Sequence, residues 1–541
     1  MEAGGQSQIP ARCTRNAAAA SSLIPRARKR LPLRARDVQL YRACDDLTEP
    51  LIYFMAVVGP WAFGTTQTWS IWLMNGAGCL LGLLLAGKLA IRWLKGYHPP
   101  RWDDVEGGRE EVVVSGQRAE GRSQRGVAAS RLTAILAGLT VAILGYCFIS
   151  VLNARATAHR EEGSFAYHSC IQWLPHSLDS SRSWPAFWTY LGLAFAFWAV
   201  RDWLLGKSES EELAERRKPQ PGDRRSGFLL PARLRRLLWV LALNGGLLGL
   251  EGIVQRLEGS GKLLFLVKPR VNPGADTQFG PYAYRANASQ YFNLLWPVCL
   301  GFWWTLNRAY GSKRKAHHLI LLCCVIMAAC PIISTSRGGA LVTVGIGVLA
   351  AFFLLATHFL LAAHRQQDRR TRTITLACLL LFFTGALALG FGLGWKTLKP
   401  RMAQLSEGFD DREGIYDRAR PMAVDYPLFG TGPGTFESVF QLYRKTTDTY
   451  WPAQLHNDWL ETRVTFGWLG SGLIALAFVV VVLRWFARGG IHGGRRFTVL
   501  IWLALAGCLV HARYDFPFQI HSIVFLFLVV CAVLSNLTRR P

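Results

Sequence analysis

Residues 340–363 read ALVTVGIGVLAAFFLLATHFLLAA, an apolar run that contains no Asp, Glu, Lys or Arg. Such a run is long enough to cross a bilayer as one helix, which takes about 20 residues. The preceding segment, STSRGG at residues 334–339, is nearly uncharged, whereas the following segment, HRQQDRRTRT at residues 364–373, is strongly basic. Because short basic loops stay in the cytoplasm, this stretch predicts a transmembrane helix together with its direction.

The same alternation extends along the chain. Other basic connections lie at residues 307–318 and 484–497, and other nearly uncharged ones at residues 64–70 and 512–519. This pattern predicts an all-α membrane protein with about twelve transmembrane helices and both termini in the cytoplasm. The expected spans are residues 50–66, 71–93, 132–153, 185–205, 236–255, 288–306, 318–335, 340–363, 374–394, 464–483, 497–512 and 518–537.

The overall composition leads to the same protein class. The 541 residues are 51% hydrophobic and include 20 Trp and 30 Phe, yet their formal net charge is +26. This combination excludes a soluble enzyme, a disordered chain and a disulfide scaffold. The basic residues punctuate apolar runs and do not gather in one segment, so we interpret them as orientation signals and expect no nucleic-acid partner.

The chain divides into four expected parts. Residues 1–48 form a basic cytoplasmic tail, residues 49–394 hold the first nine helices with flexible cytoplasmic linkers, and residues 464–541 hold the last three helices. Between them, residues 395–463 form a large loop domain outside the cytoplasm, far longer than an ordinary connection. Within it, the spacing of apolar residues over residues 411–428 predicts a helix.

Polar side chains gather at the outer ends of the expected spans, where a simple membrane anchor has no use for them. Ionisable residues at membrane depth are costly and usually functional. Each also has a plainer interpretation, because an arginine near a helix end can extend its charge to the interface and a polar residue before a helix can cap it. These candidates are Arg285, Asn287, Arg337, His456, Asp458, Glu461, Arg513 and Asp515.

A glycine-rich run, GTGPG at residues 430–434, precedes the last of these motifs. It lacks the preceding strand and the βαβ context of a dinucleotide-binding loop, so it predicts a tight turn that fixes the outer loop.

Five motifs in order carry a resemblance to a known family. YRANASQYFNLLWP, STSRGG, DYPLFGTGPGTF, HNDWLETRVTFGWLG and HARYDFPFQI together resemble the O-antigen ligase and polymerase superfamily. Its members are glycosyltransferases of the bacterial inner membrane that build cell-envelope polysaccharides from glycans linked to polyprenyl pyrophosphate. The resemblance covers the chain from about residue 235 onward. It implies about twelve spans, a large outer loop before the tenth with an essential histidine, and outer arginines that hold the lipid pyrophosphate.

On this resemblance, the arginines are expected to bind the donor. Arg337 and Arg285, with Arg513 as a third, are the expected pyrophosphate ligands, because a guanidinium group makes bidentate, permanently charged contacts to phosphate. Asn287 and Asp515 are expected to contact other parts of the substrate.

His456 is the expected catalytic residue. An imidazole can act as a general base and take a proton from a sugar hydroxyl, and Glu461 or Asp458 is expected to orient it. The outer segments contain no spaced carboxylate pair of the kind that holds a metal, so neither a metal nor a cofactor is expected.

The sequence therefore predicts a ligase that moves a glycan from undecaprenyl pyrophosphate to a hydroxyl of a glycan or lipid-glycan acceptor, such as lipopolysaccharide. The same motifs fit a polymerase that joins O-antigen or exopolysaccharide repeat units, and a protein O-oligosaccharyltransferase shares the same membrane body. A polyprenyl-lipid transporter is the alternative from another class, but it predicts broken helices and internal repeats. The sequence indicates neither.

Overall fold

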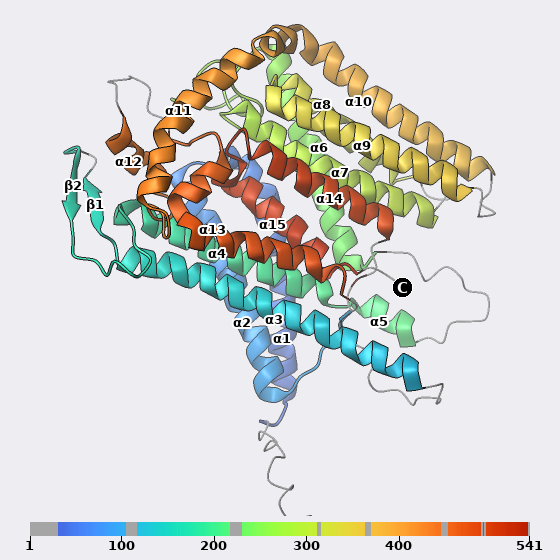
Figure 1. The fold of residues 1–541 in the computed structure, drawn as a ribbon. Coiled ribbons are helices and arrows are strands. Elements are labelled where there is room, and N and C mark those ends of the chain that lie inside the picture. Colours follow the sequence, from blue (N-terminus) through green and yellow to red (C-terminus); the bar gives the residue numbers. More distant parts are fainter. Residues whose placement is uncertain are drawn as a thin grey trace, which may run out of the picture.

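The computed structural model describes residues 31–103, 116–159, 161–216, 230–310, 315–362, 369–444, 453–487, 491 and 494–538. Within these residues the fold is mostly helical, as predicted (Figure 1). The helices are α1 Ala35–Trp61, α2 Thr68–Lys95, α3 Gly116–Leu152, α4 Ser180–Leu205, α5 Glu209–Arg216, α6 Ala232–Glu258, α7 Arg285–Tyr310, α8 His318–Ile333, α9 Arg337–Ala362, α10 Arg369–Ala403, α11 Leu405–Asp425, α12 Phe436–Val439, α13 Asp458–Arg484, α14 Arg495–His511 and α15 His521–Asn536. Short 3₁₀ helices lie at Phe63–Thr65, Phe440–Tyr443 and Pro517–Gln519.

One β-hairpin departs from the all-α expectation. Strands β1 Ala156–His159 and β2 Ser164–Tyr167 pair antiparallel, with Ala156 opposite Tyr167. Their alternating small and aromatic residues suit a pleated surface. The two segments expected to be flexible cytoplasmic linkers, residues 96–130 and 206–227, are partly helical, because α3 begins at Gly116 and α5 spans Glu209–Arg216.

Six of the described helices are long and apolar enough to cross a membrane: α2, most of α3, α6, α9, most of α10 and α13. The apolar helices α8 and α15 are shorter. The remaining expected spans also fall on helices, namely α1, α4, α7 and α14. These helices indicate a multi-pass membrane protein, whereas twelve crossings and the cytoplasmic position of the termini stay predictions from the loop charges.

The outward faces of the bundle are covered with large apolar side chains. Leu83 in α2, Val141 in α3, Phe352 in α9 and Leu381 in α10 are 70%, 70%, 74% and 68% exposed. A protein surrounded by water rarely leaves such side chains on several faces. Inside, α7 packs against α6, α8, α9, α14 and α15, and it is buried along nearly its whole length (Figure 1).

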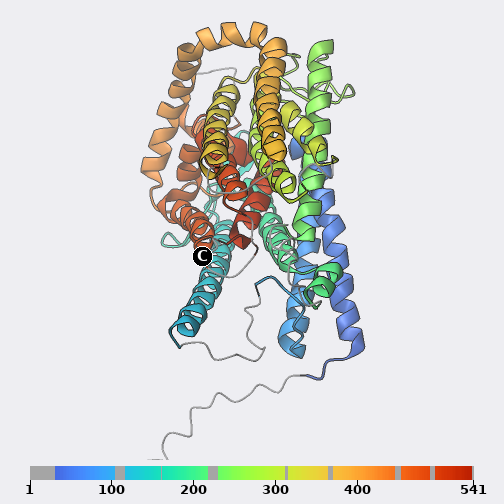
Figure 2. The ribbon, with the colours of Figure 1, turned by 90° about the vertical axis from the view of Figure 1, so that its right-hand side faces the viewer.

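The long loop before α13 is largely helical. α10 continues nine residues past its expected end at residue 394, and α11 turns back from it and descends along the bundle (Figure 2). Pro421 lies inside α11 without ending the helix, and Met422 joins a small separate core with Tyr416 and Phe436. Leu428 lies beyond the helix and is 53% exposed, so the helix predicted over residues 411–428 ends earlier than expected.

The glycine-rich run packs against a break in α13. Backbone hydrogen bonds join Thr431 N to Val464 O (2.9 Å) and Gly432 N to Thr465 O (2.9 Å). α13 is interrupted at Gly467, whose φ is +60° and where a Cβ would lie 2.3 Å from the Leu428 carbonyl oxygen. Only glycine fits this close approach in the left-handed region. The predicted tight turn is confirmed, whereas no sequence pattern indicated the broken helix.

An ion-pair cluster joins α1, α2, α4 and α6 at the far end of the bundle from this loop. Lys88 is fully buried, and its Nζ lies 2.9 Å from carboxylate oxygens of both Asp45 and Asp202. Arg233, in the first turn of α6, also pairs with Asp45. α6 is about 40 Å long at 1.5 Å per residue, and its other end brings Arg256 to the Ser334 carbonyl beside α9.

Candidate active site

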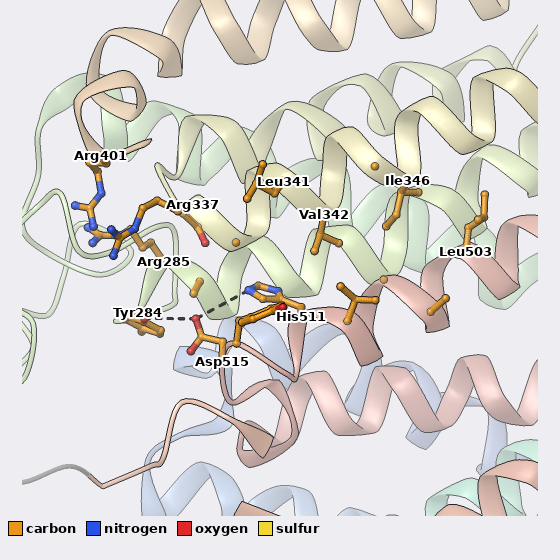
Figure 3. A pocket seen from close by; sticks show the side chains of 18 of the residues that line it. Tyr284, Arg285, Arg337, Leu341, Val342, Ile346, Arg401, Leu503, His511 and Asp515 are labelled. Atoms are coloured by element: carbon orange, nitrogen blue, oxygen red, sulfur yellow. Dashed lines mark hydrogen bonds and ion pairs between the residues drawn. The ribbon is translucent and has the colours of Figure 1, made fainter. Parts of the chain in front are cut away.

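A cavity of about 480 Å³ opens where α7 and α9 begin and where α10 and α14 end (Figure 3). One end is lined by four arginines, Arg285, Arg337, Arg401 and Arg412. An apolar part of the wall comes from two helices: Leu341, Val342, Ile346 and Leu349 of α9, and Leu503, Ala506 and Val510 of α14. Polar lining residues include Tyr284, Ser336, His511, Tyr514 and Asp515. The cavity is therefore amphipathic, with a cationic end and an apolar trough along membrane helices.

Arg337 is positioned by the abrupt junction between α8 and α9. It is the first residue of α9, and Ser336 caps that helix by accepting the Gly339 N–H at 3.1 Å. A Cβ on Gly339 would lie 2.3 Å from the Cβ of Ser289, so the glycine allows α9 to approach α7 closely. The Arg337 Nη1 donates to the Gln404 carbonyl at 2.6 Å, which ties the arginine to the link between α10 and α11.

Arg285 and Arg401 share one acidic neighbour. Arg285, the first residue of α7, donates to the Asp276 carbonyl at 2.5 Å, and its Nη1 lies 3.5 Å from the Asp276 carboxylate. The Nη1 of Arg401 lies 3.9 Å from the same carboxylate. Figure 3 shows Arg285, Arg337 and Arg401 pointing toward one another from three different helices. Guanidinium groups converging in this way form a site for an anion.

His456 lies just before α13, and its ring contacts Tyr284 and Asp515, which both line the cavity. Its φ is +57°, a left-handed conformation that is uncommon outside glycine and is often found at functional sites. Tyr416 donates to the His456 carbonyl at 2.8 Å, and the His456 Nδ1 lies 3.1 Å from the Oδ1 of Asp515. Because a carboxylate only accepts hydrogen bonds, Nδ1 carries a proton and Nε2 is the basic nitrogen of the neutral ring.

Asp515 connects His456 to the cavity. Its side chain is 6% exposed and also lies 3.8 Å from Arg412 Nη2 and 3.5 Å from the Tyr284 hydroxyl. Burial by itself would raise the pKa of Asp515, but the hydrogen bond and charge of His456, together with the charges of Arg412 and His511, hold that pKa below its ordinary value. Asp515 is therefore ionised at neutral pH and stabilises positive charge on the histidine.

Among the described residues, Asp458 and Glu461 form no hydrogen bond with the His456 ring, whose partner is Asp515, so their expected orienting role stays a prediction. The Asp458 carboxylate accepts from Phe518 N at 2.7 Å and from the Gln519 side chain at 3.1 Å, and Glu461 accepts from Leu455 N at 2.8 Å. Both are buried and fix the backbone on either side of the site. The true cap of α13 is Asn457, whose Oδ1 accepts from Leu460 N at 3.1 Å.

Two other expected residues lie away from the arginine cavity. Asn287 is buried in the first turn of α7 and is not part of the cavity wall. Arg513 lines a second cavity of about 290 Å³, whereas Asp515, two residues later, lines the first. Arg285 and Arg337 thus lie together as expected, but the third and fourth arginines of the site are Arg401 and Arg412.

His511 is a further buried group, which begins the motif HARYDFPFQI but was not among the expected site residues. Its Nδ1 lies 2.7 Å from the Oε1 of Gln290, and its Nε2 lies 4.0 Å from the Oδ2 of Asp515. Since Gln290 Oε1 can only accept, Nδ1 donates and Nε2 is left as the basic nitrogen. His511 lines the cavity next to Gly338, where a Cβ would lie 3.3 Å from Nε2.

No group of three His, Cys, Asp or Glu side chains able to hold a metal ion occurs within the described ranges. Metal independence stays a prediction from the sequence.

A comparison with models of protein families gives a match. Residues 322–475 match the model of the family described as O-Antigen ligase, which confirms the resemblance seen in the motifs. The matched segment covers less than half of the chain and contains Arg337, Arg401, Arg412 and His456. It does not reach Arg285 or Asp515, which complete the arginine cavity and the histidine pair. A search of curated proteins found no match.

Proposed function

We propose that this protein is a membrane glycosyltransferase that moves a glycan from polyprenyl pyrophosphate to an acceptor hydroxyl on the outer face of the membrane. The proposal starts from the match of residues 322–475 to the O-antigen ligase family. The observation that carries the proposal is the amphipathic cavity, because one ligand must satisfy both of its ends. A polyprenyl pyrophosphate places two phosphates among four arginines and its isoprenoid chain along the apolar side chains of α9 and α14.

The reaction follows from the position of the charged groups. The acceptor oxygen attacks the anomeric carbon of the donor sugar, and the bond between that carbon and the phosphate oxygen breaks. The bonding electrons leave with the pyrophosphate, whose charge is stabilised by Arg285, Arg337 and Arg401. The acceptor proton passes to the Nε2 of His456, and Asp515 stabilises the resulting imidazolium. Direct attack inverts the anomeric centre and releases polyprenyl pyrophosphate.

The first experiment asks whether purified protein in detergent transfers glycan from a polyprenyl-pyrophosphate donor. A transferase needs no membrane gradient, so product should form in detergent and in the presence of a chelator. A transporter would give no product under these conditions, and loss of activity with the chelator would contradict a metal-free reaction.

A second experiment separates ligase from polymerase. The gene is deleted and surface glycans are resolved on a gel. Loss of all long chains from their anchor, with lipid-linked polymer accumulating, supports the ligase. Single repeat units on the anchor would instead assign a polymerase.

A further inference from the structure

The second cavity adjoins the same histidine as the first. It is lined by Tyr416, Arg420, Asn457, Trp459, Leu460, Arg463 and Arg513, and we call it the basic groove. Tyr416 donates to the His456 carbonyl and Asn457 follows His456 in the chain, while the His456 ring bonds to Asp515 in the wall of the arginine cavity. His456 therefore connects the two cavities.

Two other segments also run from one cavity to the other. On α11, Arg412 lines the arginine cavity and Tyr416, one turn later, lines the basic groove. After α14, Asp515 lines the former and Arg513 the latter. The two cavities are thus neighbours separated by the His456 region, which is the arrangement that a transfer between two bound molecules requires.

The basic groove carries positive charge that the described residues do not neutralise. Arg420 pairs with Glu413 and Asp417. Arg463 donates through Nη2 to the Ala423 carbonyl at 3.2 Å, and its guanidinium stacks on the Trp468 ring at 4.2 Å from the centroid, while its buried Nη1 has no hydrogen-bond partner among the described residues. Neither Arg463 nor Arg513 forms an ion pair within the described part of the chain. A buried guanidinium N–H without a partner is costly unless a ligand supplies one.

Trp459 adds a surface for a sugar ring. Its side chain is 55% exposed, and its Nε1 donates to the Leu509 carbonyl at 3.0 Å, which holds the indole in place. A fixed indole offers a flat apolar face next to two cationic groups. The C–H face of a pyranose can pack on such a ring while an anionic substituent reaches the arginines.

We propose that the basic groove is the acceptor subsite and that it binds a sugar carrying a phosphate or carboxylate group. The inference rests on the proposed function, since it assigns the partner of the donor cavity. Arg463 and Arg513 bind the anionic group, Trp459 packs on the ring, and a hydroxyl of the same acceptor reaches His456.

Binding is measured with glucose 6-phosphate as the probe, on protein in phosphatidylcholine nanodiscs without any donor. Replacing both arginines, Arg463→Gln with Arg513→Gln, should weaken binding about tenfold or more, because each charge-assisted hydrogen bond to the anionic group contributes about one decade or more. Arg182→Gln is the matched control, and it should change binding less than about twofold, because Arg182 lines neither cavity and pairs with Glu437. If the double variant does not fold, Arg513→Gln alone should still weaken binding, since Arg513 is exposed.

The assignment is overturned if the folded variants bind glucose 6-phosphate as tightly as the wild type does. It is also overturned if the wild type binds neutral glucose as tightly as glucose 6-phosphate. A third contrary result is the loss of glucose 6-phosphate binding in phosphatidylglycerol nanodiscs. The last result would identify a lipid headgroup as the occupant. Inorganic pyrophosphate serves as a second probe, which the groove variants should bind normally and Arg285→Gln poorly. Because these readouts need no turnover, failure of the groove is distinguishable from failure of glycan transfer itself.

Discussion

His456 combines a rare backbone conformation with a buried carboxylate partner. Both features are explained if Nδ1 must face Asp515 so that Nε2 faces the reacting hydroxyl. We predict that His456→Ala lowers transfer by about two to four powers of ten, while the donor still binds. Transfer is measured at saturating donor, with donor binding followed separately. Near-normal transfer by His456→Ala would reduce this residue to a structural role.

Arg337 can be tested through the shape of its side chain. A residue that only extends a charge to the interface is replaced almost fully by lysine, but a planar fork that binds a diphosphate is not. Losing such charge-assisted hydrogen bonds costs about 1.5 to 3 kcal/mol each, so Arg337→Lys should lower the transfer rate by about one to two powers of ten. The comparison is with Arg337→Ala at matched expression, and a fully active lysine variant would move the phosphate role to Arg285 and Arg401.

Asp515 predicts how stability depends on pH. Its pKa in the folded protein is held below the ordinary value of about 4, so its ionised form stabilises the fold above that pH, and the stabilisation is lost as pH falls through the folded pKa. The difference in thermal midpoint between wild type and Asp515→Asn should therefore shrink as the pH falls below about 4. A difference that does not shrink in this range would contradict the stabilisation of ionised Asp515 by His456 and Arg412.

Single residues also show where sequence reasoning stops. Motifs identified His456 and Arg337 because their neighbours in sequence are distinctive, but they assigned Asp515 to the substrate and not to the histidine. The two are 59 positions apart, and nothing local indicates that they meet. Arg513 was expected to bind the pyrophosphate and Asp515 another part of the substrate, and the two residues line different cavities.

At the scale of helices, the ion-pair cluster around Lys88 is the clearest determinant of stability. Removing one member of a buried pair costs about 3 to 5 kcal/mol when the other charge is left without a partner. Asp45 keeps Arg233, and Asp202 keeps two arginines, so this range is the upper bound for the loss of Lys88. We predict that Lys88→Met lowers the denaturation midpoint in detergent markedly, while the transfer rate of the folded fraction is unchanged because the site lies at the other end of the bundle.

Lys95 on the same helix provides the control. It lies 3.7 Å from Asp37, and both side chains are more than 20% exposed, so Lys95→Met should cost at most about 1 kcal/mol. Equal effects of the two substitutions would show that Lys88 has no special role.

Helix positions were largely predictable, because an apolar run fixes a membrane helix locally. Helix ends were not. The continuation of α10 to Ala403 and the turn into α11 bring Arg401 and Arg412 to the cavity, and this depends on packing outside the bilayer that the hydropathy of the run does not encode.

At the scale of the whole molecule, the side of the membrane on which the site lies follows from the loop charges. A reporter that is active only outside the cytoplasm should work when fused within residues 395–463 and fail within residues 365–372. The reverse pattern at either position would place His456 and Arg337 in different compartments and exclude a shared active site.

One face of α11 carries Arg412, Tyr416 and Arg420 at successive turns, so this helix contacts both cavities. Successive turns are about 5.4 Å apart, and side-chain rotation cannot change that interval. In the proposed reaction, the distance between the donor cavity and the basic groove is therefore set by the helical rise of α11. Inserting a single residue after Arg412 would turn the later positions by about 100°, and it would move Tyr416 and Arg420 away from the groove without changing any side chain of either cavity.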